Sequence, residues 1–256
     1  MNNDNLWRAA EAAADPLATD TSAPGATAPA QAATGLYVLK NVRKTYDQSG
    51  KKVNALDGMT LVIGRGELVS VQGPTGGGKS TLMQMLGALD RPTTGDIMFD
   101  GTDLSTASDR TLAEMRAKRV GFAFQSYNLI PTLTAQENVE TALAPLGVSK
   151  ADRRSRAAKA LEAVGLGDRG AHLPAELSGG QQQRVAIARA IVKDPDVILA
   201  DEPTGNLDEA MRDEVMDLLV STARQRGITL IIVTHDKAVA QRLDRHLVIA
   251  KGRLSA

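Results

Sequence analysis

The stretch GPTGGGKST, at Gly73–Thr81, decides the expected fold of this sequence. It satisfies the pattern G-x-x-x-x-G-K-[S/T], in which the glycines allow backbone N–H groups to approach phosphate oxygens. The apolar run ELVSVQ precedes it, and a helical pattern at about 79–88 follows it. A buried strand, a glycine-rich loop and a helix in this order predict an α/β fold built around a phosphate-binding loop, the P-loop.

The P-loop residues predict a nucleotide site. Lys79 supplies a positive charge for the β- and γ-phosphates, and the Ser80 hydroxyl can bind Mg²⁺. The alternative is a glycine-rich turn with an incidental lysine, but such a turn rarely has the complete spacing between the right elements. The residues expected to bind the nucleotide are Gly73, Pro74, Thr75, Gly76, Gly77, Gly78, Lys79, Ser80 and Thr81.

Composition and charge restrict the possible functions. Lys and Arg total 30, as do Asp and Glu, so no net charge would attract nucleic acid. The sequence has no cysteine, which excludes disulfides and thiolate metal sites and fits a reducing compartment. No apolar run approaches the about 20 residues needed to cross a bilayer, and no secretory signal is evident. We therefore expect a cytoplasmic protein without a nucleic-acid partner.

The chain is expected to consist of a tail and one domain. Residues 1–34 are rich in Ala, Thr and Pro, with too few bulky apolar residues to fold alone. An alternative for this tail is a short helix over 5–14 that docks on a partner through Leu6 and Trp7. The domain is expected to comprise residues 35–256.

In the domain, strand patterns alternate with helical patterns. The strand bodies are apolar and are expected to be buried on both faces, which favours a mostly parallel sheet. A segment at about 126–178 is helical in pattern and forms an insertion. The expected strands are 36–42, 59–63, 67–72, 120–124, 197–200, 229–233 and 246–250, and the main expected helices are about 79–88, 108–118, 134–143, 151–165 and 208–226.

Polar residues follow several of the apolar strands. Because ligands bind beyond the carboxyl ends of parallel strands, we expect these side chains to share a site. Asp201 can hold the Mg²⁺ shell, and Glu202 can accept the proton of an attacking water. Gln125 can orient that water or touch the metal, and His235 can donate to the γ-phosphate. Singly, His235 could instead be a helix cap and Gln125 a solvated loop residue.

A second helix start also has the features of an anion site. In LSGGQQQRVAIARA, at Leu177–Ala190, two glycines open an amphipathic helix whose first N–H groups and dipole attract anions. This second site has no lysine of its own.

Taken together, these motifs resemble the ATP-binding-cassette (ABC) ATPases over residues 36–252. The matching features are the P-loop, a Gln loop at Gln125, the signature LSGGQ at 177–181, VILADEP at 197–203, GNLD at 205–208 and a His switch at His235. The resemblance implies a P-loop NTPase core, an antiparallel β subdomain and the helical insertion. It also implies that Tyr46 stacks on adenine.

In this family, two chains sandwich two ATP molecules head to tail. The resemblance therefore implies that the second anion site acts on the nucleotide of a partner copy, which explains the absence of its own lysine. The residues implied in this contact are Ser178, Gly179, Gly180, Gln181 and Asp208.

The wording of two motifs resembles one branch of the family. FQSYNLIPTLTAQENV at 124–139 and ADEPTGNLD at 200–208 are similar to cassettes of the LolD, MacB and FtsE type. This implies an ATPase on the inner face of the cell membrane that powers a transporter of the export or lipoprotein-extraction type. The alternative is an ATPase that regulates extracytoplasmic enzymes, or senses, without transport. An integral permease subunit is expected to dock near Tyr127–Leu133, with Tyr127 and Leu129 in a groove and Leu133 in the core.

Overall fold

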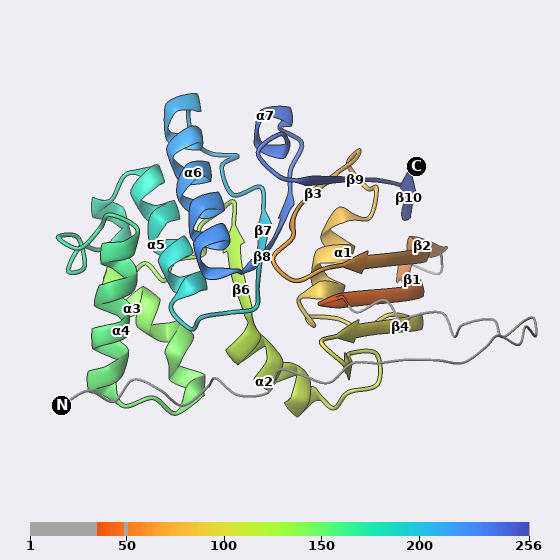
Figure 1. The fold of residues 1–256 in the computed structure, drawn as a ribbon, viewed down its shortest axis with the longest axis horizontal. Coiled ribbons are helices and arrows are strands. Elements are labelled where there is room, and N and C mark those ends of the chain that lie inside the picture. The colour runs from red at the N-terminus through yellow and green to blue at the C-terminus, as the bar shows by residue number, and fades with distance from the viewer. Residues whose placement is uncertain (1–34, 49–50, 256) are drawn as a thin grey trace, which may run out of the picture. The chain divides into compact units, whose positions relative to one another are not determined.

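The computed structural model describes residues 35–48 and 51–255 (Figure 1). The expectations for the tail at 1–34, including the docking helix with Leu6 and Trp7, lie outside these residues.

The central feature is a six-stranded sheet in the order β10-β9-β3-β8-β7-β6. All neighbouring strands pair in parallel except β10 with β9, so the predicted mostly parallel sheet is confirmed. The strands of this sheet are β3 (Leu68–Gln72), β6 (Val120–Phe124), β7 (Val197–Asp201), β8 (Thr229–Val233), β9 (Arg245–Ala250) and β10 (Arg253–Ser255).

A second sheet is antiparallel and has the order β2-β1-β4-β5, as the family resemblance implied. Its strands are β1 (Tyr37–Gln48), β2 (Lys51–Ile63), β4 (Thr94–Phe99) and β5 (Thr102–Asp103). The sequence analysis missed β4, because TGDIMF buries only alternate residues near its end and has no continuous apolar run. It also ended the first strand at 42, whereas pairing with β2 carries β1 on through charged residues to Gln48.

The helices lie on both sides of the parallel sheet. In the view of Figure 1, α1 is beside the antiparallel sheet, and α3, α4 and α5 gather on the other side of β7 and β8. One expected helix, at 134–143, is shorter: α3 ends at Glu140 and continues as the 3-10 segment η1. The helical elements are α1 (Lys79–Leu86), α2 (Asp109–Arg119), α3 (Ala135–Glu140), η1 (Thr141–Leu146), α4 (Lys150–Ala163), η2 (Pro174–Glu176), α5 (Gly179–Ile191), α6 (Glu209–Arg226) and α7 (Lys237–Ala240).

Two apolar cores form against opposite faces of the parallel sheet. Along β8, Ile231 and Val233 belong to the core that contains α1, while Leu230 and Ile232 belong to the core that contains α5. This alternation follows from the period of two along a strand. It explains why β8 is buried at every position and why its sequence shows no polar alternation.

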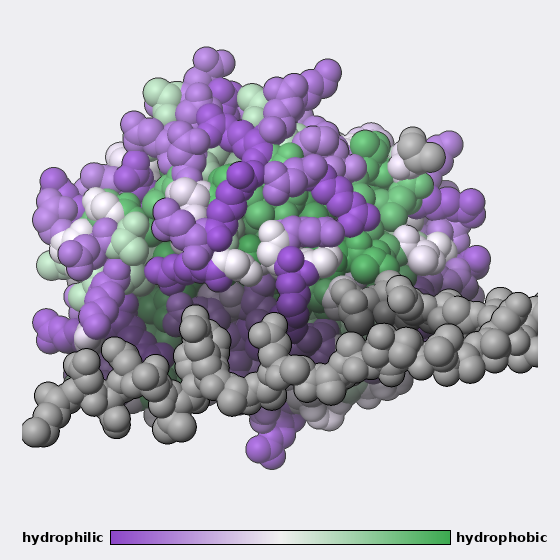
Figure 2. Space-filling view, viewed as in Figure 1, coloured by the Kyte–Doolittle hydropathy of each residue, from purple (hydrophilic) through white to green (hydrophobic). Residues whose placement is uncertain are grey.

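The outer surface of the helices is polar. In the same view, Figure 2 shows mostly hydrophilic side chains over α6 and the helical insertion, with hydrophobic side chains gathered nearer β9 and β2. Val248 of β9 and Val53 of β2 are among the large apolar residues with exposed side chains. Among the described residues, no helix combines the length and apolar character that a membrane span requires.

An ion-pair network joins the two sheets at the end of the parallel strands opposite the P-loop. Arg119, just before β6, donates to Asp196 and Asp100, and its guanidinium lies 4.7 Å from the centre of the Phe99 ring. Arg65, just before β3, pairs with the same two carboxylates. The network therefore connects the amino ends of three parallel strands with the antiparallel sheet.

Candidate functional site

The P-loop connects β3 to α1 through a close approach of several backbones. Gly73 has φ 145°, and a Cβ there would lie 2.0 Å from the carbonyl oxygen of Ile249. Gly78 has φ 107°, and its Cβ would lie 2.4 Å from the carbonyl oxygen of Ala55. Only glycine fits such positions, because an added Cβ would collide with backbone that cannot move aside. The loop is thus held between β9 and β2.

The Lys79 ammonium lies over this loop. Its Nζ donates to the carbonyl oxygens of Gly73, at 2.8 Å, and of Pro74, at 3.0 Å. Both bonds hold the positive charge of Lys79 at the P-loop, where the sequence motif predicts it.

Asp201 is the last residue of β7 and is about half buried. Burial raises the pKa of the Asp201 carboxyl above its ordinary value, the charge of Glu202 acts in the same direction, and Lys79 opposes them. A carboxylate that is partly desolvated beside a like charge is stabilised by a cation. The Asp201 carboxylate can therefore be stabilised by a nearby cation, and Lys79 is close enough to act on it.

Glu202 is held in a defined orientation beside His235. Its Oε1 accepts from the His235 backbone N–H at 3.0 Å and lies 2.7 Å from His235 Nδ1. Its Oε2 accepts from the Thr234 hydroxyl at 3.1 Å. Glu202 has φ 47°, a left-handed conformation that is strained for a residue with a side chain. The structure brings these two sequence-predicted residues into direct contact.

Gln125 is exposed, and its side chain also contacts the GNLD segment. Its Nε2 donates to Asn206 Oδ1 at 3.1 Å, and Asn206 Nδ2 donates to the Gln125 carbonyl oxygen at 3.0 Å. A Cβ at Gly205 would lie 2.9 Å from Gln125 Nε2. Asn206 was not singled out from the sequence, and only the reciprocal amide pair reveals it.

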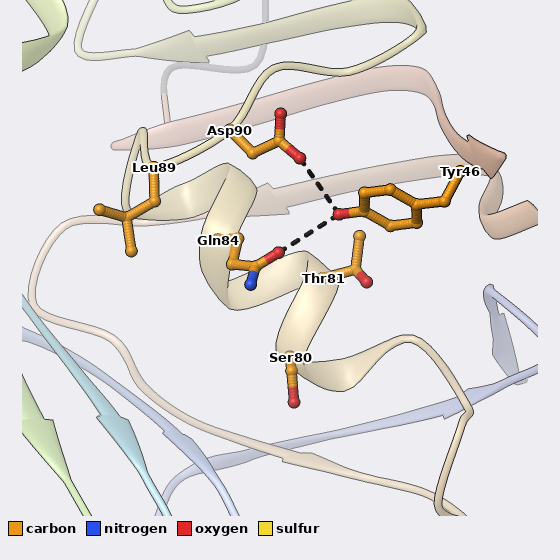
Figure 3. Close-up of a pocket in the computed structure, with 6 residues that line it drawn as sticks. All are labelled: Tyr46, Ser80, Thr81, Gln84, Leu89 and Asp90. Atoms are coloured by element: carbon orange, nitrogen blue, oxygen red, sulfur yellow. Dashed lines mark hydrogen bonds between the residues drawn. The ribbon is translucent and has the colours of Figure 1, made fainter. Parts of the chain in front are cut away.

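Tyr46 and the start of α1 line one pocket of about 560 Å³, shown in Figure 3. The pocket thus contains the predicted adenine-stacking ring together with two P-loop residues. Its lining residues are Tyr46, Ser80, Thr81, Gln84, Leu89 and Asp90.

The LSGGQ segment forms a capped helix start. Ser178 is the N-cap of α5, where its Oγ accepts from the Gln181 N–H at 3.3 Å and Gln181 Oε1 accepts from the Ser178 N–H at 2.9 Å. A Cβ at Gly179 would lie 2.9 Å from the Tyr127 hydroxyl, and one at Gly180 would lie 2.1 Å from Met211 Sδ. The two glycines therefore have a packing role that the sequence analysis did not predict. Asp208, also predicted from the sequence, is the N-cap of α6.

The start of α5 and the P-loop belong to different sides of the sheet. Helix α1 contributes Leu82 to one core and α5 contributes Ile187 to the other, on opposite faces.

In the segment 127–133, Tyr127 and Leu129 are expected in a groove and Leu133 in the core. Leu129 and Leu133 are both partly buried, and Leu129 packs against the α5 core. The large apolar side chain with the greatest exposure here is Ile130, at 44%. Tyr127 is also partly exposed, and its carbonyl accepts from Arg189 at 2.7 Å.

A P-loop between a buried strand and a helix, with Asp201 and Glu202 at the carboxyl end of β7 in the same parallel sheet, defines a P-loop NTPase. A family model described as "ABC transporter" matches residues 56–205. The chain belongs to this family, whose ATP-binding domain hydrolyses ATP.

Individual relatives agree with the family. The macrolide export ATP-binding/permease protein MacB of Brucella melitensis is 50% identical, over 86% of this chain and 34% of its own length. This chain thus spans about a third of that relative. The lipoprotein-releasing system ATP-binding protein LolD of Syntrophus aciditrophicus is 41% identical, over 84% of this chain and 97% of its own.

A solved structure also matches the fold. The dimeric ATP-binding cassette MJ0796, in a post-hydrolysis state bound to ADP and Pi, superposes with a TM-score of 0.79. It is 42% identical, and the match covers 86% of this chain and 97% of that one. The predicted P-loop fold and the resemblance to the LolD and MacB branch are confirmed.

The contact between Gly180 and Met211 yields a stability prediction. Alanine favours a helix more than glycine does, yet Gly180→Ala should lower the free energy of unfolding by about 1–3 kcal/mol, because its Cβ would overlap the Met211 side chain. Chemical denaturation measures the change. Met211→Ala in the same chain should restore much of the loss, and Gly167→Ala, whose nearest atom is 3.8 Å away, should be tolerated. An equally stable Gly180→Ala chain would show that the contact is unimportant.

Proposed function

We propose that this chain binds ATP with Mg²⁺ at the P-loop, hydrolyses it within a head-to-tail pair of chains, and so powers a membrane transporter of the export or lipoprotein-extraction type. The observation that carries the proposal is the placement of Lys79, Asp201, Glu202 and His235 at one edge of the parallel sheet.

Phosphate binding follows from the P-loop geometry. Backbone N–H groups of the loop and the start of α1 face the phosphates, and the Lys79 ammonium neutralises their charge. Two of the three N–H groups of the Lys79 ammonium donate to the carbonyl oxygens of Gly73 and Pro74, which leaves the third to donate to a phosphate oxygen.

Asp201, Ser80 and Gln125 are the proposed magnesium ligands. The raised pKa of Asp201 supports this assignment, because a nearby cation would stabilise its ionised form. Bound Mg²⁺ would neutralise charge on the phosphates. Gln125 Nε2 donates to Asn206 Oδ1, which leaves Gln125 Oε1 to bind the metal, so metal binding would be connected to the GNLD segment.

Glu202 is the proposed general base. While its carboxylate is ionised, His235 Nδ1 must carry the proton of their 2.7 Å contact, and neutral His235 then has no N–H at Nε2 to donate. We propose that His235 leaves Glu202 when the γ-phosphate binds. That movement would supply a donor to the phosphate and free a Glu202 oxygen to accept the proton of the attacking water.

The partner copy is proposed to complete each site. Ser178, Gly179, Gly180 and Gln181 would meet the γ-phosphate held by the other chain, with Asp208 nearby. Support comes from the opposite placement of α1 and α5 and from the dimeric state given for MJ0796.

An integral membrane subunit is proposed to dock beside 127–133, which would place the chain on the inner face of the membrane. The names of MacB and LolD support a membrane partner for this chain. Gln125 lies directly before this segment, and Ile130 is its most exposed apolar side chain. A docked helix would therefore lie next to a residue that is proposed to bind the metal, which would couple docking to nucleotide occupancy.

The role of Glu202 is tested by Glu202→Gln, which keeps shape and hydrogen bonding but cannot accept a proton. Steady-state hydrolysis should fall at least ~10²-fold, while ATP binding persists and an ATP-dependent dimer becomes long-lived in gel filtration. Glu209→Gln, on the exposed first turn of α6, is the matched control and should hydrolyse ATP normally. Normal turnover by Glu202→Gln would remove Glu202 from the mechanism.

The docking segment is tested by Ile130→Asp. A charge at an exposed position should leave folding and ATP binding intact but prevent co-purification with the membrane subunit and any stimulation of hydrolysis by it. Val53→Asp changes an apolar residue of β2 that is 38% exposed and serves as the control. Undiminished capture of the membrane subunit by Ile130→Asp would place the interface elsewhere.

A further inference from the structure

The side chains of Tyr46, Asp90 and Lys44 meet at the edge of the Tyr46 pocket. Asp90 and Lys44 have no part in the proposed catalytic steps. The Tyr46 hydroxyl donates to Asp90 Oδ2 at 3.1 Å, and Lys44 Nζ donates to Asp90 Oδ1 at 2.7 Å. Figure 3 shows the Tyr46 hydroxyl directed between Asp90 and Gln84, whose Oε1 is 3.3 Å away. That second distance is long for an O–H donor, so Asp90 is the main acceptor.

Asp90 is itself fixed by several donors. Besides Lys44, the Arg91 backbone N–H donates to Asp90 Oδ1 at 2.7 Å, and Lys44 also donates to the Arg91 carbonyl oxygen at 2.8 Å. Burial acts to raise the pKa of the Asp90 carboxyl, but these contacts outweigh it and hold the pKa below its ordinary value. The Lys44 side chain is only 13% exposed, so this pair is better shielded from solvent than a typical surface ion pair.

Lys44 also contacts the tyrosine ring. Lys44 and Tyr46 are two residues apart on β1 and therefore point to the same side of the strand. Lys44 Nζ lies 5.0 Å from the centre of the Tyr46 ring, within the range of a cation–π contact. Lys44 thus contacts both the Asp90 carboxylate, which accepts from the Tyr46 hydroxyl, and the Tyr46 ring.

The position of Asp90 in the chain gives this arrangement a consequence for the nucleotide. Helix α1 begins at Lys79 in the phosphate cradle and ends at Leu86, and Asp90 follows in the next turn of chain. Tyr46, by contrast, belongs to the antiparallel sheet. The Tyr46–Asp90 bond therefore fixes the ring relative to the same helix that carries Ser80 and Thr81.

We propose that Asp90, held by Lys44, is a positioning residue that sets the Tyr46 ring at the correct place and angle to receive the base of a nucleotide whose phosphates lie in the P-loop. This inference rests on the proposed nucleotide site and adds a residue to it. Asp90 acts through Tyr46 and does not touch the phosphates.

The experiment compares two ligands that share phosphates but differ in the base. MgATP and magnesium tripolyphosphate are titrated by calorimetry into the wild-type chain and into Asp90→Ala, Tyr46→Phe and the double variant. Loss of the anchoring bond should weaken MgATP binding roughly threefold to tenfold in each single variant. Binding of tripolyphosphate should not change, because these variants leave the P-loop intact.

The double variant separates positioning from general damage. If the hydroxyl and Asp90 act through one bond, the double variant should bind MgATP no more weakly than either single variant. Asp109→Ala removes a carboxylate that pairs with Arg91 and is 92% exposed, and it should bind both ligands as the wild type does. Equal weakening of both ligands by Asp90→Ala would show a merely structural role, and unchanged MgATP binding would overturn the proposal.

A further variant distinguishes failure of this inference from failure of the site. Tyr46→Ala should abolish most of the preference for MgATP over tripolyphosphate. If it does so while Asp90→Ala has no effect, Tyr46 is the base platform but Asp90 does not position it. If the wild-type chain binds neither ligand, the proposed nucleotide site itself is wrong.

Discussion

The register of the parallel sheet is the constraint on which the rest of the site depends. Phe124, Asp201, Val233 and Val71 are paired in one row across β6, β7, β8 and β3. The residues just beyond this row are therefore level as well, and they include Gln125, Glu202 and Thr234, with the P-loop starting beyond β3. A slip of one residue in a single strand would turn its buried side chains to the other face and move its polar end out of the row.

The second requirement is that the antiparallel sheet keeps a fixed position relative to that edge, because it carries Tyr46. Contacts near both ends of β1 provide this. At its start, the Tyr37 hydroxyl donates to the Leu86 carbonyl oxygen at 2.8 Å, and Arg119 joins Asp100, which follows the Phe99 paired with Tyr37, to Asp196 before β7. Near the other end of β1, the Tyr46 hydroxyl donates to Asp90. The side chains of the two Arg119 ion pairs are about a third exposed, and each pair contributes little to stability alone. Their main effect is to fix the position of the antiparallel sheet relative to the parallel sheet.

Local sequence signals predicted most of the fold because each is carried by consecutive residues. The P-loop, the fully apolar strand β8 and the capped start of α5 are examples. What the sequence missed depends on residues distant in the chain. Gly180 is packed by Met211, Gln125 pairs with Asn206, and Leu129 packs against the α5 core.

Gln183 illustrates the same limit. It follows Gln181 and Gln182 in a uniform run, yet it is fully buried, and neither of its amide atoms has a hydrogen-bond partner among the described residues. Gln183 differs from Gln181 and Gln182 only in the direction in which its side chain points from α5. The polar strand ends Gln125, Glu202 and Thr234 lie at one edge because the parallel register sets them level, and local sequence is enough to place each of them after its strand.

The central claim is that the P-loop of one chain and the start of α5 of another face the same nucleotide. Because the chain has no cysteine, engineered cysteines report on this directly. Thr75 and Ser178 are both exposed, so Thr75→Cys and Ser178→Cys are made in separately tagged chains that also carry Glu202→Gln. With MgATP, a short bis-maleimide should link one chain of each kind into a covalent heterodimer, and without nucleotide the product should be scarce. A single chain that carries both cysteines and is linked only within itself, with no ATP-dependent dimer, would contradict the account.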